Sequence, residues 1–209
     1  AAGVRGGPVP APHAGPRWAR GPHLRRPRHG GARKHRRAAE ALAEAVRLAV
    51  PRAEVRCEDF LDSVPAWLRR SYPATYYLLV RRLAVVWGLA FEAFDWPIIN
   101  RLIQPLRRIW NLSMARRFVD RMRNDPPDLI ITTHFFPADV ISACKQAGWL
   151  RAPLVVVITD LHPHRFWLTP QPEAYVCDME ETAVTARARG IAPERLHVLG
   201  IPVAAACHA

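Results

Sequence analysis

Residues 154–160 read Leu-Val-Val-Val-Ile-Thr-Asp, a continuous apolar run that ends in two polar side chains. Such a run is typical of a parallel strand that is covered on both of its faces. Residues 128–136, Asp-Leu-Ile-Ile-Thr-Thr-His-Phe-Phe, have the same character and predict a second buried strand. Ligands of open α/β sheets bind beyond the carboxyl ends of the strands, so the polar ends of these two runs mark the expected site.

Strands and helices alternate around this pair. A helix is expected from Pro137 to Gly148, since proline is favoured in a first helical turn and glycine just after a last one. The alternation predicts an α/β fold built on a doubly wound, Rossmann-like parallel sheet. The other expected elements are helices at 38–49 and 111–123, strands at 53–60, 174–177 and 195–203, and a helix capped by Asp178 and ended by Gly190.

Residues 64–110 depart from this alternation and hold nine aromatic side chains among seven arginines. Their pattern predicts helices that are broken at Pro73, Pro97 and Pro105. Aromatics at helical spacing usually pack in a core, but a doubly wound sheet does not need so long a helical insertion. Because Trp, Tyr and Arg together suit a membrane interface, we favour interfacial contact. The side chains expected to contact the membrane are Trp67, Arg69, Arg70, Tyr76, Tyr77, Arg81, Arg82, Trp87 and Trp96.

The basic charge of the chain is concentrated at its start. The sequence holds 30 Lys and Arg against 18 Asp and Glu, and ten of the basic residues, with no acid, lie within residues 1–37. Of the formal charge of +12, the remaining residues carry only +2, so the charge does not indicate a globular nucleic-acid-binding domain. We expect residues 1–34, rich in Arg, Pro and Gly, to be a disordered basic segment. The alternative is a functional tail that is attracted to anionic phosphate on lipid or nucleic acid.

The cysteine and hydropathy patterns exclude several classes of protein. Cysteines at positions 57, 144, 177 and 207 lie far apart, which argues against a disulfide framework and a cysteine-based zinc site. The longest uncharged apolar run, 83–91, is too short to span a bilayer, and no signal peptide is visible. Asp160, His162 and His164 are residue types that can bind a metal, but their spacing fits no zinc pattern, so no metal is expected.

Three further positions could carry chemistry. Gly30 and Gly31 precede an expected helix, and His35 lies at the N-terminal end of that helix. Glycine lets a ligand approach the backbone closely, and a helix N-terminus favours an anion. Asp160 either faces the crevice beyond its strand or caps the following turn. Trp167 is either a core residue or an apolar wall for a sugar or a lipid.

Taken together, these segments resemble the N-terminal domain of the family of monogalactosyldiacylglycerol synthases and processive diacylglycerol glucosyltransferases. The resemblance covers residues 30–203 and depends on the order and spacing of several short motifs rather than on any single one. These motifs are His-Arg-Arg-Ala-Ala-Glu-Ala-Leu at 35–42, Pro-Asp-Leu-Ile-Ile-Thr-Thr-His at 127–134, Thr159-Asp160 followed by His164 and Trp167, and Gly190-Ile191, Val198 and Gly200-Ile201-Pro202-Val203.

The resemblance implies a GT-B architecture, in which two Rossmann-like domains enclose the active site. Residues 35–203 would be the N-terminal domain, which in that family holds the lipid acceptor and touches the membrane, while a C-terminal domain binds the UDP-sugar. His35 would be the general base that takes the acceptor hydroxyl proton during inverting transfer, since an unperturbed histidine titrates at about 6.5. The acceptor and lipid site would hold Gly30, Gly31, His134, Asp160, His164 and Trp167.

The protein implied by this resemblance is a peripheral hexosyltransferase on the cytoplasmic face of the cell membrane. Its expected partners are a UDP-sugar donor, a diacylglycerol acceptor and an anionic membrane surface, with no cofactor and no nucleic acid. The sequence departs from the family at residues 32–34, where Ala-Arg-Lys stands in place of glycines, and no apolar strand precedes this loop. We therefore expect residues 1–34 to be a shifted reading frame or a damaged gene end.

The other end of the sequence gives a second expectation. Residues 204–209 would be the truncated start of a linker, so that the donor-binding half is absent and this chain alone transfers no sugar. Two other classes of function stay open. A non-catalytic membrane-surface binding module would use the same aromatic and arginine insertion. A basic nucleic-acid-binding protein would use residues 1–37, but the aromatics lie in expected helices rather than on a basic strand face that could stack on bases.

Overall fold

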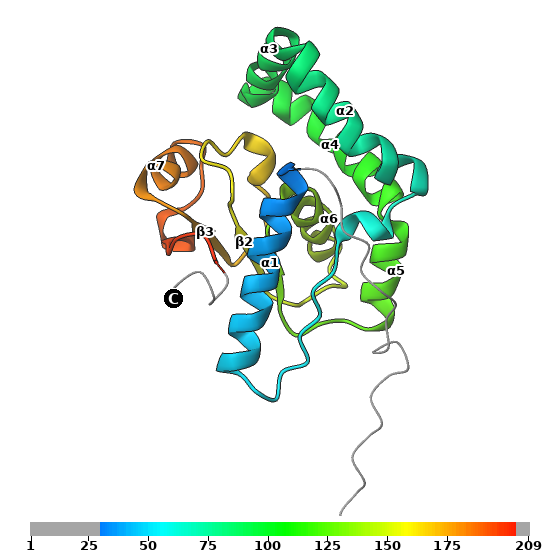
Figure 1. Ribbon diagram of the computed structural model, residues 1–209, viewed down its shortest axis with the longest axis vertical. Coiled ribbons are helices and arrows are strands. Elements are labelled where there is room, and N and C mark those ends of the chain that lie inside the picture. The colour runs from blue at the N-terminus through cyan, green and yellow to red at the C-terminus, as the bar shows by residue number, and fades with distance from the viewer. Residues whose placement is uncertain (1–29, 204–209) are drawn as a thin grey trace, which may run out of the picture.

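The computed structural model describes residues 30–203, whose centre is a four-stranded parallel sheet (Figure 1). The strands lie side by side in chain order, and every neighbouring pair is parallel, as in the pairing of Ile131 with Val155. The predicted α/β class and parallel sheet are therefore confirmed. The strands are β1 (Ile130–Thr132), β2 (Leu154–Val157), β3 (Ala174–Cys177) and β4 (Leu196–Val198).

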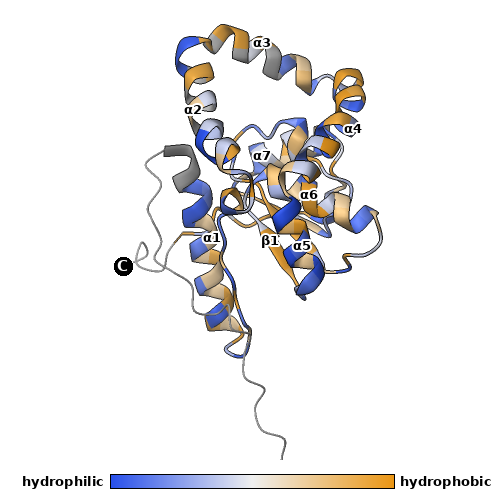
Figure 2. Cartoon of the chain, turned by 90° about the vertical axis from the view of Figure 1, so that its right-hand side faces the viewer, coloured by the Kyte–Doolittle hydropathy of each residue, from blue (hydrophilic) through white to orange (hydrophobic). Residues whose placement is uncertain are grey.

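Helices lie on both sides of this sheet. In Figure 2, α1 (Gly30–Ala49) is on one side of the strands, and α5 (Arg116–Asn124) and α6 (Phe135–Gln146) are on the other. Leu154, Val156 and Ile158 are consequently fully buried. The residues between them, which point to the opposite face of the sheet, are apolar too. Burial from both sides is the physical reason why the β2 sequence shows no polar alternation.

Glycines end the two helices that connect neighbouring strands. α6 joins β1 to β2, and α7 (Glu180–Ala188) joins β3 to β4. Gly148 and Gly190, which follow them, have φ angles of +81° and +106°, a backbone region that glycine adopts without a steric penalty. Both predicted helix ends are confirmed. Asp178, however, lies one residue before the N-cap of α7, and its carboxylate accepts from the Met179 N–H.

Three helices extend beyond the sheet and form what we call the helical lobe (Figure 1). They are α2 (Ala66–Arg82), α3 (Ala84–Asp95) and α4 (Pro97–Met114), and they confirm the predicted helical insertion. Only one of the three expected proline breaks is present: Pro97 begins α4, whereas α2 runs through position 73 and α4 runs through Pro105.

Tertiary contacts explain why α4 continues through Pro105. On the next turn, Arg107 pairs with Asp139 of α6 over 3.1 Å, and Asn111 donates to the same carboxylate over 2.7 Å. The guanidinium of Arg108 also donates to the Ala143 carbonyl over 3.1 Å. These bonds hold the turns that follow the proline against α6, and they offset the single helical hydrogen bond that proline removes.

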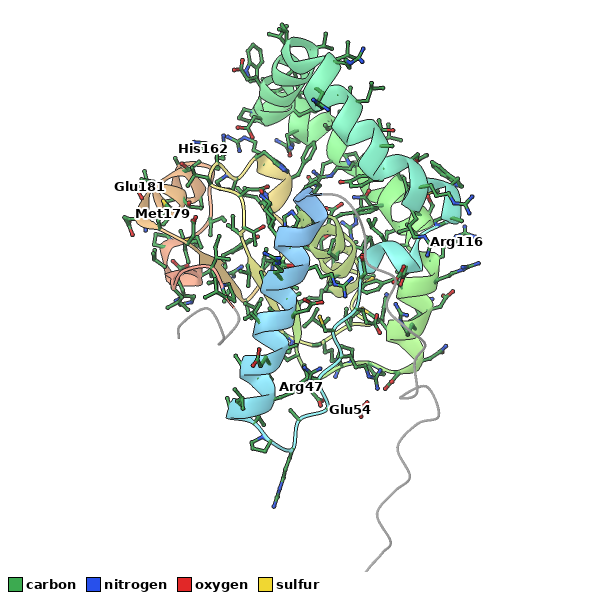
Figure 3. All side chains as sticks on the ribbon, viewed as in Figure 1. Arg47, Glu54, Arg116, His162, Met179 and Glu181 are labelled. Atoms are coloured by element: carbon green, nitrogen blue, oxygen red, sulfur yellow. The ribbon has the colours of Figure 1, made fainter. Side chains whose placement is uncertain are left out.

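The prediction of a strand at 53–60 is wrong. Residues 53–59 are an irregular segment, followed by the 3₁₀ turn η2 (Phe60–Ser63), and the described part of the chain offers them no neighbouring strand. Side chains hold the segment instead, since Arg47 at the end of α1 donates to the Val55 carbonyl over 2.9 Å, and Arg47 and Glu54 lie close together in Figure 3. A β-type sequence without a strand partner forms no ladder.

Several boundaries also differ from expectation. α1 begins at Gly30, so residues 30–34, the last of the segment expected to be disordered, are helical, and the glycines lie in the first turn of α1. The expected strand at 195–203 shortens to β4, after the 3₁₀ turn η4 (Pro193–Arg195). The expected helix at 111–123 is divided at Ala115 between α4 and α5. The predictions for residues 1–29 and 204–209 lie outside the described residues.

Candidate active site

His35 lies in the second turn of α1 and is held against the carboxyl ends of β1 and β2. Its Nδ1 is 2.8 Å from the carbonyl oxygen of Thr133 and 2.7 Å from the hydroxyl oxygen of Thr159. The Thr133 hydroxyl donates in turn to the His35 carbonyl over 3.0 Å. These hydrogen bonds fix the ring at the strand ends, where the sequence places the site.

The contacts of His35 determine its tautomer. Because a carbonyl oxygen can only accept, Nδ1 carries the proton that is donated to Thr133. Nε2 is then unprotonated, and no described residue forms a hydrogen bond with it. Burial lowers the pKa of His35, although the Thr133 carbonyl and the Asp160 carboxylate act in the opposite direction. The ring is therefore neutral at pH 7 and can accept a proton at Nε2.

Asp160 follows β2 and connects α1 with η3 (Arg165–Trp167). Its Oδ1 is 2.6 Å from the ammonium of Lys34, and its Oδ2 accepts a 3.0 Å hydrogen bond from the Trp167 indole. Burial alone would raise the carboxyl pKa, but Lys34 and the indole N–H outweigh it and hold the pKa of Asp160 below its ordinary value. Asp160 is thus held as a carboxylate between α1 and η3, and the fully buried Trp167 is a core residue whose polar edge supports it.

His134 and His164 have equivalent structural roles. The Nδ1 of each accepts a 3.1 Å hydrogen bond from the backbone N–H two residues later and thereby caps α6 and η3, respectively. Burial lowers the pKa to about 3 in His134 and to about 4 in His164. Both rings are therefore neutral, with the proton on Nε2, where His134 can act as a hydrogen-bond donor.

The predicted catalytic residue and four of the predicted acceptor-site residues meet at this edge of the sheet: His35, His134, Asp160, His164 and Trp167. The His134 ring packs edge-on against His35 with centroids 4.8 Å apart, and it lies 6.2 Å from the Trp167 ring. Gly30 and Gly31 lie one turn before His35 in α1 rather than in a loop. His162, labelled in Figure 3, is exposed and is not one of these five residues.

The sequence reading missed three residues that hold His35 and Asp160 in place. In the sequence, Lys34 belongs to the basic segment, and Thr133 and Thr159 stand at strand ends with no predicted role. The two threonines could have been found in the sequence, because each one ends an apolar run. A hydroxyl at the carboxyl end of a strand can form a hydrogen bond with a residue of a helix that packs there. Lys34 carried no such signal, because only the fold brings it to Asp160, 126 residues later.

The helical lobe presents a second candidate surface, made of exposed apolar side chains. On α4, Ile98, Leu102, Leu106 and Ile109 recur at helical spacing, and each is at least 66% exposed. Figure 2 shows apolar residues along much of α3 and α4. Contiguous exposed apolar surface of this kind marks a protein or membrane interaction site. The prediction named aromatics and arginines and missed these aliphatic residues, although their three- and four-residue spacing is visible in the sequence.

The described residues among those expected to contact the membrane are exposed at the surface of the lobe. Trp67 and Trp96 are more than half exposed, and Trp67 packs edge-on with Trp110. Arg70, Arg81 and Arg82 are exposed, and so is Arg69, which pairs with Asp62 over 3.2 Å. The side chains of Tyr76, Tyr77 and Trp87 lie outside the described residues.

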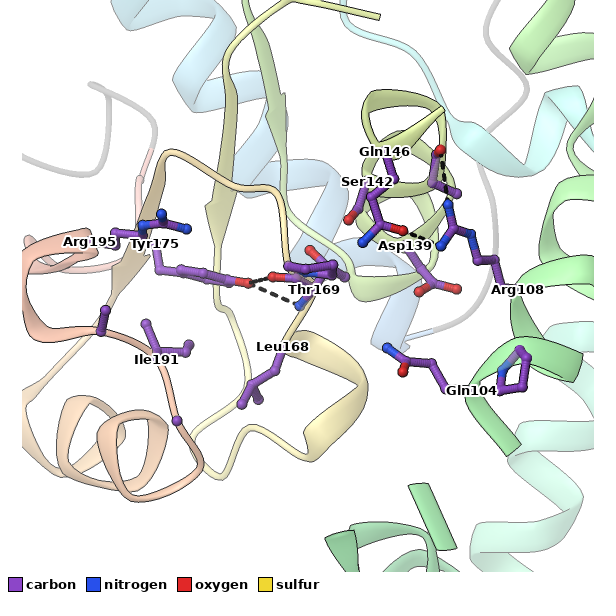
Figure 4. Close-up of a pocket in the computed structure, with 15 residues that line it drawn as sticks. Gln104, Arg108, Asp139, Ser142, Gln146, Leu168, Thr169, Tyr175, Ile191 and Arg195 are labelled. Atoms are coloured by element: carbon purple, nitrogen blue, oxygen red, sulfur yellow. Dashed lines mark hydrogen bonds between the residues drawn. The ribbon is translucent and has the colours of Figure 1, made fainter. Parts of the chain in front are cut away.

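A separate hollow of about 610 Å³ lies between α4, α6 and the chain that precedes β3 (Figure 4). The crossover from β2 to β3 contains η3 and no α-helix, and this leaves space over the sheet between α6 and α7. The hollow shares no lining residue with the His35 cluster. Its labelled lining residues are Gln104, Arg108, Asp139, Ser142, Gln146, Leu168, Thr169, Tyr175, Ile191 and Arg195.

Two searches of the described residues gave negative results. None of the helices in residues 30–203 is both long and apolar enough to cross a membrane. Within the same residues, no group of His, Cys, Asp or Glu side chains is arranged to hold a metal ion.

Comparisons with known proteins agree on one family. The family model described as monogalactosyldiacylglycerol (MGDG) synthase matches residues 35–203. The processive diacylglycerol β-glucosyltransferase of Staphylococcus epidermidis is 28% identical over 114 residues, which are 54% of this chain and 28% of that protein. Its Staphylococcus aureus counterpart is 31% identical over 87 residues, 42% of this chain and 22% of that protein. The matching part thus spans less than a third of either relative. No solved structure matches.

Proposed function

Since the chain belongs to the monogalactosyldiacylglycerol synthase family, we propose that residues 35–203 form the acceptor-binding domain of a membrane-associated glycosyltransferase. The enzyme would move a hexose from a UDP-sugar to diacylglycerol. Glycosyltransfer to diacylglycerol is the activity named for both Staphylococcus relatives. In this proposal a second Rossmann-like domain binds the UDP-sugar, as the family resemblance implies, and the described residues bind and deprotonate the acceptor.

The observation that carries the proposal is the state of His35. Its Nδ1–H is committed to the Thr133 carbonyl, and Nε2 is left as the basic nitrogen at the edge of the sheet. The acceptor hydroxyl gives its proton to Nε2 while its oxygen forms a bond to the anomeric carbon of the sugar. The bond from that carbon to the UDP phosphate oxygen breaks in the same step, and UDP leaves with the electron pair. Inversion at the anomeric carbon follows from this direct displacement.

The neighbours of His35 would support this step electrostatically. Proton transfer makes an imidazolium, and the Asp160 carboxylate, whose charge raises the His35 pKa, stabilises it. The Thr133 carbonyl holds the ring orientation by accepting from Nδ1. His134, neutral with its proton on Nε2, supplies a donor that can bind an oxygen of the acceptor next to the reacting hydroxyl.

The helical lobe would bring the domain to the lipid. Diacylglycerol stays within a bilayer, so its enzyme must work at the membrane surface. The aliphatic row of α4 and the exposed tryptophans supply apolar area for the interface, and the arginines at the end of α2 together with Arg101 of α4 supply attraction to anionic headgroups. We therefore assign the lobe as the part of the domain that contacts the membrane, peripherally.

The test of catalysis is the His35→Ala variant of the full-length protein, assayed for transfer from UDP-glucose and UDP-galactose to diacylglycerol in vesicles. Loss of a general base should lower kcat by roughly 10²-fold or more, with vesicle binding unchanged. His162→Ala is the matched control, since His162 is exposed and outside the cluster, and it should keep the wild-type rate.

A non-catalytic membrane-binding module is the second candidate, favoured by the exposed apolar row of α4. If His35→Ala transfers sugar within about twofold of the wild-type rate, His35 is not the base. If the wild-type protein binds vesicles but transfers no sugar, the non-catalytic module replaces the enzyme. Turnover by the 209 residues alone would overturn the division of the reaction between two domains.

A further inference from the structure

The segment between β2 and β3 carries three residues of the candidate site, Asp160, His164 and Trp167, yet it contains no α-helix. A crossover without a helix has few backbone bonds of its own, so its position depends on side chains from elsewhere. α7 supplies one of these, because Thr182 donates to the Leu161 carbonyl over 3.2 Å. The helical lobe and Arg189, which follows α7, supply others.

Asp95, the last residue of α3, is the centre of these lobe contacts. Its carboxylate accepts from the Arg165 backbone N–H over 2.8 Å, and its own carbonyl accepts from the Arg165 Nε over 2.6 Å. The carboxylate also pairs with Arg189, which follows α7 and donates to the Pro163 carbonyl. The Asp95 side chain is only 19% exposed, so solvent screens these charges weakly.

Packing reinforces the same junction. The Phe166 ring of η3 lies 5.9 Å from the Phe94 ring of α3 and 6.2 Å from the Phe135 ring of α6. The Arg107 guanidinium of α4 covers it, 4.2 Å from the ring centroid. η3 is therefore enclosed between two helices of the lobe and one helix of the sheet unit.

We propose that Asp95 is a positioning residue that couples the helical lobe to the acceptor site, so that docking of the lobe on a membrane restrains residues 160–167. This inference rests on the proposed membrane contact of the lobe. The route is short: Asp95 holds Arg165, and Trp167, two residues further on, donates to the Asp160 carboxylate beside His35. A surface that immobilises the C-terminal end of α3 therefore also immobilises the residue that supports the general base.

Hydrogen exchange of the full chain tests this coupling. The backbone amides of residues 160–168 are measured by mass spectrometry with and without vesicles that contain anionic lipid and diacylglycerol. In the wild-type protein, vesicles should slow exchange of this segment at least twofold. In Asp95→Ala, vesicles should no longer slow it, although the variant binds vesicles as tightly as the wild type.

Two further variants separate coupling from a loss of folding. Asp62→Ala removes an exposed partner of Arg69 near the start of α2, and it should retain the vesicle-dependent protection. Asp95→Asn keeps an oxygen that accepts from the Arg165 N–H, and it should restore at least half of the protection that Asp95→Ala loses. A merely structural role would instead speed exchange by the same factor with and without vesicles.

The outcomes distinguish the two proposals. If the wild-type chain does not bind vesicles, the membrane contact is wrong and the coupling falls with it. If the wild-type chain binds vesicles without any change in residues 160–168, the coupling alone is overturned. It is overturned also if Asp95→Ala keeps the full vesicle-dependent protection.

Discussion

The sheet unit and the helical lobe use apolar residues in opposite ways. In the sheet unit, Leu154, Val156 and Trp167 are fully buried, and the polar side chains at the strand ends are bonded to one another. On α4, Leu102 and Leu106 are each 71% exposed. One chain thus contains a region whose apolar residues build a core and a region whose apolar residues remain on the surface.

This difference shows that hydrophobic content alone does not separate core from interface. The lobe is joined to the sheet unit by polar contacts, in which Arg107 and Asn111 bond Asp139, and Arg165 and Arg189 bond Asp95, and by the packing of Phe94 against Phe166. Because Leu102 and Leu106 take no part in these contacts, the aliphatic face of α4 stays available for another partner. A core helix would have used that face to pack against the sheet.

The largest expected difference between the two regions is in stability. Leu154→Ala removes a fully buried side chain and should lower the free energy of unfolding by about 2–5 kcal/mol. Leu102→Ala is the same substitution at a 71% exposed position and should change it by less than about 0.5 kcal/mol. Urea denaturation of both variants measures the contrast, and similar losses would show that α4 packs as part of the core.

Acid should destabilise the sheet unit specifically. In the unfolded chain a histidine titrates at about 6.5, whereas the pKa is about 3 for His134 and about 4 for His164 in the folded protein. Below pH 6.5 the unfolded chain therefore binds more protons. The stability from each neutral histidine is fully present above pH 6.5 and is lost as the pH falls towards 4, by up to about 1.4 kcal/mol per pH unit.

The control for this pH dependence is His164→Asn, which keeps an oxygen that can cap η3 but does not titrate. Its unfolding free energy, measured by denaturation from pH 7 to pH 4.5, should fall less steeply than that of the wild type. An unchanged slope would mean that the buried state of His164 does not control acid stability.

The smallest expected effect concerns membrane contact by the lobe. Leu102→Ala should weaken binding to anionic vesicles by about tenfold, since each buried methylene contributes about 0.8 kcal/mol and an interfacial side chain is only partly inserted. Leu48→Ala, at the far end of α1 from the lobe in Figure 1 and equally exposed, is the matched control. If both variants bind vesicles equally in a sedimentation assay, α4 does not contact the membrane.

Much of the fold follows from local patterns in the sequence. The runs at 128–136 and 154–160 predict buried parallel strands because parallel sheets are covered on both faces, and Gly148 and Gly190 end helices because the chain turns there with positive φ. The candidate site residues His134 and Asp160 were found for the same reason, since they directly follow strands. Properties of this kind depend on neighbours in the chain, so the sequence displays them.

Tertiary structure decided what depends on partners distant in the chain. Residues 53–59 form no strand because no described strand lies beside them, and α4 continues through Pro105 because α6 binds the turns that follow it. The tautomer of His35 is set by Thr133, and Asp95 reaches Arg165 across 70 residues. A side chain's type is fixed by the sequence, but its hydrogen-bond partner, its burial and hence its protonation depend on the surroundings that only the folded chain supplies.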